Sequence, residues 1–345
     1  MKTKLVLFVI LCLLNFGLAK SQAISSSAGN GINGFSGDGG PATKAEFSHP
    51  IGVAFDQEGN AYIADANNNR IRKIDTQGII TTIAGTGAMG YSGDGGKASL
   101  AKLNFPSGIV CDEQGNLFFA DEGNNVVRKI NNRGIISTIA GKGSGGFSGD
   151  GNLANVAELD APTSVALDNK GNIFIADYGN NRIRKINKDG YISTIAGTGT
   201  AGFSGNGGPG NKAMLDSPIG IACDESGNVY IADENNNCIR KVNTAGIITS
   251  FAGNGEQDYK GDGGTASSAS FFWPAGLAFD KEGNLYVADE GNSVIRQINA
   301  KGEVNTFKGN EKVKLLEPVV IAFDPMGNMY VADETTSIIC RNFKH

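Results

Sequence analysis

The segment DEQGNLFFAD at residues 112–121 decides the fold, because related segments recur along the whole chain. Each copy has an acidic start, a Gly-Asn turn, a short apolar run and a closing Ala-Asp pair. The six copies begin at Asp56, Asp112, Asp168, Asp224, Asp280 and Asp324, so successive starts are 56, 56, 56, 56 and 44 residues apart. Self-similarity at a fixed period of this length indicates a repeat architecture.

Each copy is predicted to contain four β-strands. In the second copy, four runs rich in β-branched and aromatic residues are separated by Gly-Asn, Gly-Asn-Asn and Asn-Arg-Gly turns. The runs are residues 107–112, 116–121, 125–130 and 134–139. None reaches the ~10–12 residues expected of a helix. Four antiparallel strands in ~50 residues are typical of a β-propeller blade.

The two ends of the chain predict a closed ring rather than an open solenoid. The sixth copy ends after its third strand, near residues 337–343, whereas residues 23–31 match the fourth strand of the third copy at residues 191–199. Pairing these ends would remove the exposed sheet edges of an open stack. We therefore predict an all-β fold, a six-bladed β-propeller of four-stranded antiparallel blades whose last blade is completed by an N-terminal strand.

The first residues have the pattern of a signal peptide. Lys2 and Lys4 precede an apolar run over residues 5–14 and small residues at Gly17 and Ala19. We expect residues 1–19 to be removed, with cleavage after Ala23 as the alternative, and residues 20–345 to form one propeller domain. A retained anchor is disfavoured because the run is shorter than the ~20 residues of a span. The sequence therefore predicts an exported protein, periplasmic or secreted, with no membrane span after processing. The absence of any Asn-x-Ser/Thr sequence favours a bacterial source.

Charge and histidine content limit the function classes. The formal net charge of −5 argues against nucleic-acid binding, which requires a basic stripe. His49 and His345 are the two histidines, whereas a zinc lyase would need about three from different blades. No Gly-x-Ser-x-Gly elbow of a serine hydrolase occurs. We expect no cofactor, and Ca²⁺ or Mg²⁺ held by carboxylates remains the alternative.

Two sets of aspartates recur with the repeat. The residues that close each Ala-Asp pair are predicted to be structural, bonding the backbone of the turn between the second and third strands. This set is Asp65, Asp121, Asp177, Asp233, Asp289 and Asp333. The second set lies in Gly-rich linkers, at the expected N-terminus of a single helical turn. Its members, which are also weak candidates for cation ligands, are Asp38, Asp94, Asp150 and Asp262, with Asn206 at the cognate position.

Arginines and cysteines are interpreted as structural. An arginine lies seven residues after each turn aspartate and is expected to bridge carboxylates and backbone oxygens, because the guanidinium group suits such pairing. The arginines are Arg72, Arg128, Arg184, Arg240 and Arg296, and the sixth copy has Cys340 there. Cys111, Cys223, Cys238 and Cys340 are predicted to be buried free thiols, because no pair is placed for a disulfide.

Positions that break the repeat are the best candidates for a binding site. The residues before the proline that opens each blade are predicted to surround one mouth of the central channel. They are His49, Phe105, Ala161, Ser217, Trp273 and Glu317. After the turn aspartate stand Glu122, Glu234, Glu290 and Glu334, with Ala66 and Tyr178 as exceptions. The ligand-binding candidates are His49, Phe105, Tyr178, Ser217, Trp273 and Glu317. Long linkers make this face the expected binding surface, and its acidic rim favours a cation, a basic peptide or a polar sugar.

The repeated pattern P-x-G-(I/V/L)-A-x-D-x-x-G-N-(L/A/V)-Y-(I/V)-A-D-x-x-N-N-x-I-R-K-I resembles that of NHL-repeat propellers. The G-x-G-x-x-G-(F/Y)-S-G-D-G-G-x-A linkers are similar to those of exported bacterial members and of the teneurin NHL domain. The resemblance covers residues 22–343. It implies a platform that binds proteins or ligands, and related propellers include lyases and lactonases with a channel metal.

These observations predict an exported, monomeric, noncatalytic propeller. Its loop-rich face would bind a protein, peptide or carbohydrate ligand. The alternative is a metal-assisted hydrolase, lactonase or lyase that uses Ca²⁺ or Mg²⁺ at the channel mouth.

Overall fold

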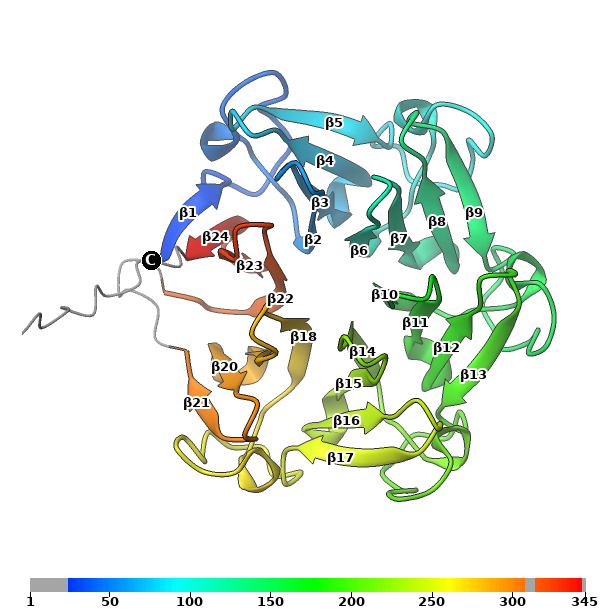
Figure 1. Cartoon of the computed structure of the whole chain (residues 1–345). Helices are drawn as coiled ribbons and strands as arrows, with labels where there is room; N and C mark the ends of the chain where they lie inside the picture. The colour runs from blue at the N-terminus through cyan, green and yellow to red at the C-terminus, as the bar shows by residue number, and fades with distance from the viewer. Residues whose placement is uncertain (1–23, 308–313, 343–345) are drawn as a thin grey trace, which may run out of the picture.

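The computed structural model describes residues 24–307 and 314–342. In these ranges the chain forms six four-stranded antiparallel sheets arranged around a central axis (Figure 1). The predicted all-β, six-bladed propeller is confirmed. None of the helices in the described ranges is both long enough and apolar enough to cross a membrane.

The first three blades follow the chain from the innermost to the outermost strand. Blade 1 contains β2 (Pro50–Phe55), β3 (Ala61–Asp65), β4 (Arg70–Ile74) and β5 (Ile80–Ala84). Blade 2 contains β6 (Pro106–Cys111), β7 (Leu117–Asp121), β8 (Val126–Ile130) and β9 (Ile136–Ala140). Blade 3 contains β10 (Pro162–Leu167), β11 (Ile173–Asp177), β12 (Arg182–Ile186) and β13 (Ile192–Ala196).

The remaining blades follow the same order. Blade 4 contains β14 (Pro218–Cys223), β15 (Val229–Asp233), β16 (Cys238–Val242) and β17 (Ile248–Ala252). Blade 5 contains β18 (Pro274–Phe279), β19 (Leu285–Asp289), β20 (Val294–Ile298) and β21 (Val304–Thr306). Blade 6 contains β22 (Pro318–Phe323), β23 (Met329–Asp333), β24 (Ile338–Asn342) and β1 (Ile24–Ala28).

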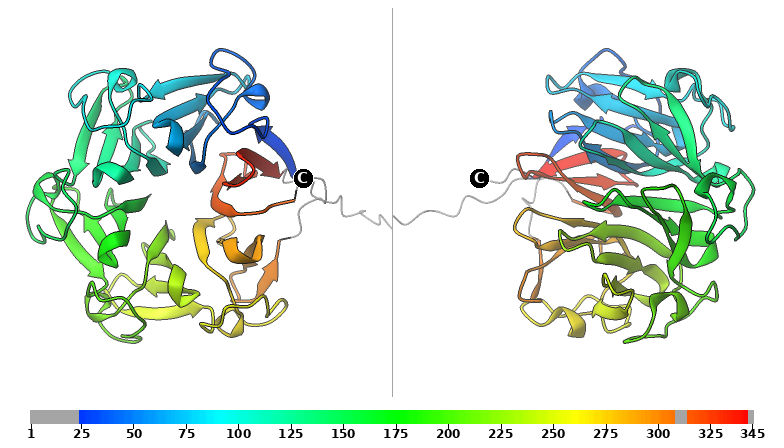
Figure 2. Two further views of the ribbon diagram at one scale, coloured as in Figure 1. Left: turned by 180° about the vertical axis from the view of Figure 1, so that it is seen from behind. Right: turned by 45° about the vertical axis from the view of Figure 1, so that its right-hand side comes forward.

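Short 3-10 helices lie in two places in the repeat. The linkers carry η1 (Ala42–Lys44), η3 (Ala98–Leu100), η5 (Ala154–Val156), η7 (Gly210–Lys212) and η9 (Ala266–Ser268). The turns after the second strand carry η2 (Ala66–Asn68), η4 (Glu122–Asn124), η6 (Tyr178–Asn180), η8 (Glu234–Asn236) and η10 (Glu290–Asn292). The linkers project from the outer edge of the ring (Figure 2).

The ring is closed by the N-terminal strand. β1 pairs antiparallel with β24, and Ile24 lies opposite Asn342. Figure 1 shows this first strand beside the last strands of the chain. Ala28 of β1 is fully buried. The predicted closure is therefore confirmed, and it leaves neither end of the ring as a free sheet edge.

Apolar side chains fill the spaces between neighbouring blades. In one such cluster Ile71 of blade 1 packs with Ile109 and Phe119 of blade 2, and the linker between the blades adds Ala98 and Leu103. Burial of this kind is the main favourable contribution to folding. The linkers thus form part of the core as well as connecting the blades.

The inner strands approach one another closely at the axis. A Cβ atom on Gly52 would lie 2.7 Å from the carbonyl oxygen of Ser107, and one on Gly220 would lie 2.1 Å from that of Ala275. Only glycine permits such contact between backbones. These glycines let the six blades surround a central channel without steric clash.

A buried arginine ties each of the first five blades to the linker before it. We call this arrangement the arginine clamp. In blade 1, Nη1 of Arg72 lies 3.1 Å from Oδ2 of Asp65, and Nη2 lies 2.8 Å from Oδ1 of the linker residue Asp38. In blade 4 the linker acceptor is Oδ1 of Asn206, 3.0 Å from Nη2 of Arg240. The expectation that these arginines bridge carboxylates and backbone oxygens is confirmed.

The clamp corrects two details of the sequence interpretation. The linker helices do not have their aspartate at the N-terminus: the residue before η1 is Pro41, and Asp38 bonds Arg72 instead. Within their own turn the aspartates mostly accept from the side-chain amide of an asparagine, as Asp65 does from Asn68, rather than from the backbone as predicted. Oδ1 of Asp65 accepts from the backbone N–H of Ser48, seventeen residues earlier.

Blade 6 departs from this pattern. Cys340 occupies the arginine position and is 1% exposed. Asp333 accepts hydrogen bonds from the backbone N–H groups of Leu316, Glu317 and Thr336. The linker before blade 6 is the one shortened by 12 residues in the sequence. In the described residues of blade 6, the turn aspartate therefore holds the linker without a clamp arginine beside it.

The four cysteines in the described ranges are free thiols, but they are not all buried. Cys238 and Cys340 are buried, whereas Cys111 and Cys223 are only half-buried. The latter two lie at the ends of inner strands, where they face the central channel. The prediction of burial is therefore wrong for Cys111 and Cys223.

Candidate functional site at the channel mouth

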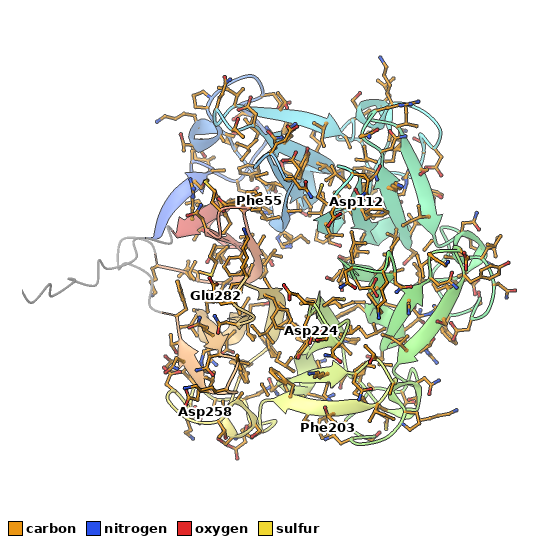
Figure 3. All side chains as sticks on the ribbon, in the orientation of Figure 1. Phe55, Asp112, Phe203, Asp224, Asp258 and Glu282 are labelled. Atoms are coloured by element: carbon orange, nitrogen blue, oxygen red, sulfur yellow. The ribbon has the colours of Figure 1, made fainter. Side chains whose placement is uncertain are left out.

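A central cavity of about 610 Å³ runs along the axis and is lined by residues of all six inner strands. Each inner strand, such as β2, has six residues, so the wall is about 20 Å long. A cavity of this size, with apolar walls and a few polar groups, is typical of a small-molecule site. Phe55 and Asp224 lie near the axis in Figure 3, whereas Phe203 and Asp258 lie at the outer edge.

Paired hydrogen bonds fix the residues that enter the inner strands. The turn aspartate of each blade accepts from the N–H of the residue two positions before the opening proline, as Asp121 does from Asn104. The next N–H, that of Phe105, donates to Oδ1 of Asn69 in the preceding blade. The residue directly before the opening proline, such as Phe105, is thereby held in the left-handed region of backbone conformation. The positive φ angles are 59° for His49, 53° for Phe105, 43° for Ala161, 56° for Ser217 and 50° for Trp273.

This geometry places the linker ends and the second turns on one face. The N–H of Ala66, which begins η2, donates to the carbonyl oxygen of His49 at 3.2 Å. At the opposite ends of the same strands lie tight turns, such as the one closed by the Gly59 N–H to Asp56 carbonyl bond. The longer segments therefore surround one mouth of the channel.

Four glutamates stand at this mouth and line the cavity. They are Glu122, Glu234, Glu290 and Glu334, contributed by blades 2, 4, 5 and 6. Burial raises the pKa of Glu122, Glu234 and Glu290 to about 7 each. Around Glu290, repulsion from Glu234, Glu334 and Glu317 adds to the effect of burial. The carboxylates of blades 4, 5 and 6 thus form one electrostatically coupled group, which we call the acidic arc.

Aromatic side chains occupy the other half of the mouth. His49, Phe105 and Tyr178 line the cavity from blades 1, 2 and 3. The rings of His49 and Phe105 lie 5.3 Å apart, centroid to centroid. His49 Nδ1 lies 3.1 Å from Oε1 of Glu334, across the junction of blades 1 and 6. Burial lowers the pKa of His49, and nearby Glu317 partly opposes this shift. We call these three residues the aromatic arc.

The structure separates the six sequence-predicted candidates into two groups. His49, Phe105 and Tyr178 line the cavity, whereas Ser217, Trp273 and Glu317 do not. Ser217 bonds Asn235 and Asp216. Trp273 is 41% exposed and its ring packs on that of Phe272 at 4.5 Å. Glu317 bonds the Thr335 hydroxyl.

From the sequence, the four glutamates are predicted only to form an acidic rim. The signal that could have identified them is their position directly after the turn aspartate, which the fold places at the channel mouth in every blade. Ala66 and Tyr178 hold the same position in blades 1 and 3. Because Ala66 and Tyr178 carry no carboxylate, the mouth is asymmetric.

The linker aspartates face the arginines of the clamps. Oδ1 of Asp38, Asp94, Asp150 and Asp262 lies 2.7–3.0 Å from a guanidinium nitrogen. An arginine of the protein, rather than a bound cation, therefore supplies the positive charge beside each of these carboxylates. In the described ranges, no group of three or more His, Cys, Asp or Glu side chains converges closely enough to hold a metal ion. The side chains at the mouth thus do not fit the channel metal that related lactonases imply.

Comparison with known proteins agrees with the repeat geometry. The sequence profile of the teneurin NHL domain matches residues 29–92, 88–146, 144–202, 199–259 and 252–324. The chain belongs to the teneurin NHL family. The NHL propeller is 31% identical over 279 residues to Teneurin-1 from Gallus gallus, which covers 69% of this chain and 10% of that protein. It is 30% identical over 281 residues to Protein SUPPRESSOR OF QUENCHING 1, chloroplastic, from Arabidopsis thaliana, which covers 75% of this chain and 26% of that protein. The NHL propeller thus spans only a minor part of these relatives.

Solved structures share the fold of this NHL propeller. An auxiliary nutrient binding protein from Bacteroides ovatus superposes with a TM-score of 0.67 at 12% identity, covering 94% of this chain and 76% of that one. A virginiamycin B lyase from Staphylococcus aureus gives a TM-score of 0.57 at 16% identity, covering 94% of this chain and 100% of that one. At such identities the likeness concerns the fold alone.

Proposed function

We propose that this NHL propeller is an exported, noncatalytic binding protein that holds its ligand at the mouth of the central channel. The observation that carries the proposal is the position of His49, Phe105 and Tyr178, which break the repeat and line one cavity. Repetition accounts for the residues that build the blades, but it does not require an aromatic side chain at these three positions. A shared fold with an auxiliary nutrient binding protein supports the same interpretation.

The proposed ligand is a protein segment, a peptide or a carbohydrate, bound by a monomeric propeller. The cavity lies inside one chain and is complete without a second copy. The carboxylates at the mouth would repel phosphates and other anions. Because the pKa values of three of these glutamates are raised to about 7, the carboxyl groups are only partly ionised at neutral pH. The mouth is therefore also compatible with neutral polar ligands.

Two tryptophan substitutions test the location of the binding site. Ile219→Trp adds bulk to the cavity wall, whereas Leu100→Trp adds it to the outer edge, where Leu100 is 71% exposed. A library of basic, neutral and acidic peptides and neutral oligosaccharides is screened by interferometry, and circular dichroism verifies the fold of both variants. We expect library members that bind the unmodified protein to bind Leu100→Trp equally well and to lose binding to Ile219→Trp.

Two results would contradict the proposal. Equal binding by both variants would place the binding surface outside the channel. Absence of binding by every library member to the unmodified protein would remove the basis for a peptide or glycan receptor.

A further inference from the structure

The cavity has opposite chemical character at its two ends. At the mouth, the described lining residues with titratable side chains are His49, Tyr178 and the four glutamates. No described lining residue is Lys or Arg. The far end of the wall is formed by the last residues of the inner strands, which are apolar or weakly polar. Those that line the cavity are Phe55, Cys111, Leu167, Cys223 and Phe323. A ligand that fills the channel therefore meets carboxylates at one end and hydrocarbon at the other.

The two halves of the mouth complement one kind of head group. The acidic arc of Glu234, Glu290 and Glu334 offers negative charge, and the aromatic arc offers the rings of Phe105 and Tyr178. An ammonium group is attracted both to carboxylates and to aromatic faces, and the attraction to the ring grows when water is excluded. Neither an anion nor an uncharged head group would gain from both arcs.

A buried hydroxyl in the wall gives an independent indication of a ligand. Ser107, the second residue of β6, is 2% exposed and lines the cavity. Burial raises the pKa of Glu122, and the nearby Ser107 hydroxyl offsets part of that rise. It nevertheless has no hydrogen-bond partner of normal geometry among the described residues. Buried polar groups are nearly always bonded, so an orphaned one at a cavity calls for a partner.

We propose that the channel binds an amphipathic organic cation, with an ammonium head between the acidic and aromatic arcs and an apolar body along the inner strands. This inference rests on the proposed function: it keeps the site at the channel mouth and adds a class of ligand to the peptides and carbohydrates proposed above. A hydrated metal ion would leave the apolar side chains of the wall unused. The N–H groups of the head supply the donor that the Ser107 hydroxyl lacks.

Matched probes separate the contributions of head and body. Calorimetric titrations compare octylammonium with three matched probes. Octanol lacks the charge, octanoate reverses it, and methylammonium lacks the tail. We expect octylammonium to bind at least tenfold more tightly than octanol, and we expect octanoate and methylammonium not to bind. Equal affinity for octanol and octylammonium would overturn the assigned head-group site.

Variants locate the head group. Glu290→Gln removes a carboxylate of the acidic arc, while Glu113→Gln changes an exposed glutamate in a tight turn on the opposite face. We expect octylammonium affinity to fall about tenfold in the first variant and to stay unchanged in the second. Unchanged affinity in Glu290→Gln would contradict the proposal. Because this substitution removes a carboxyl that is costly to ionise, it should not impair folding.

The Ser107 contribution is tested with a probe that has no N–H groups. Ser107→Ala should weaken octylammonium several-fold but leave octyltrimethylammonium unchanged, since the latter cannot donate a hydrogen bond. Equal weakening of both probes would show that Ser107 only shapes the wall. If peptides or oligosaccharides depend on Ile219 while no octylammonium binds, the proposed function stands and this inference fails.

Discussion

The outer edge of the ring and the channel mouth are built by the same repeat, but they keep it to different degrees. At the outer edge, five arginine clamps repeat with nearly the same distances, 3.1–3.3 Å to the turn aspartate. At the mouth, the position after that aspartate changes between blades. It is Ala66, Glu122, Tyr178, Glu234, Glu290 and Glu334 in turn. Adjacent positions in the chain thus differ in role: the constant ones build the blade, and the variable ones give the channel mouth its chemical character.

Removing the closing strand should have the largest effect on the constant part. A chain that begins at Gly29 lacks β1, so the edge of β24 is exposed and the buried contacts of Ala28 are lost. We expect the free energy of unfolding to fall by roughly 5 kcal/mol or more, a large part of ordinary stability. Urea denaturation measures this loss.

A chain that begins at residue 22 keeps β1 and serves as the control. If both chains unfold at the same urea concentration, the pairing of the two ends does not stabilise the ring.

Breaking one clamp should have the next largest effect. Arg128→Ala removes the partner of buried Asp121 and of Asp94, and it leaves an uncompensated charge in the blade. Such losses cost about 3–5 kcal/mol. The matched control is Arg133→Ala, because that side chain is exposed. Equal destabilisation of the two variants, measured by urea denaturation, would contradict a structural role for the clamp.

Changing pH should act chiefly on the variable part, while burial also raises the pKa of the turn aspartates Asp121 and Asp233 to about 6. Glu122, Glu234 and Glu290 have folded-state pKa values of about 7, above the ordinary value of 4.5. Their contribution to stability is fully present below pH 4.5 and is lost as the pH rises through 7, because the folded state then gives up protons that it binds more tightly than the unfolded chain. Between pH 5 and 8 we expect a combined loss of roughly 2 kcal/mol, after allowing for partial exposure.

The pH effect is measured as a difference between variants. Thermal melting of the unmodified protein and of Glu122→Gln is followed over this range, and the variant should lose less stability as the pH rises. Identical pH profiles would show that Glu122 does not titrate near neutral pH. His49, whose pKa is lowered, acts only on the acidic side of this range.

Chelation should have the smallest effect. The described side chains form no group able to hold a metal ion, and the linker carboxylates face arginine. We expect EDTA to shift the melting temperature by less than about 1 °C, because a ligand that binds the folded state would otherwise stabilise it. A large EDTA-dependent loss of stability or of ligand binding would favour the metal-assisted alternative.

Periodicity explains how much of this structure could be predicted. The strands, the closure and the bridging arginines follow from features that recur at the same place in each copy. The contact of Arg72 with Asp38 spans 34 residues and depends on how a linker folds back over a blade, so the sequence suggested a helix terminus instead. The directions of side chains at left-handed positions were also not accessible. His49 turns into the channel, whereas Trp273 packs on Phe272.

Blade 6 shows that two distant changes in the chain belong together. In blades 1–5 a full-length linker delivers a carboxylate or amide oxygen to the buried arginine. The shortened linker lacks the Gly-rich segment that carries this residue in the sequence, so an arginine at position 340 would keep Asp333 as a partner but lack the linker acceptor, which would leave buried N–H groups unbonded. The small, neutral Cys340 avoids that cost. Anyone who grafts a linker from another blade into the gap before Glu317 should therefore introduce Cys340→Arg at the same time. Either change alone would introduce one partner of the linker–arginine hydrogen bond without the other.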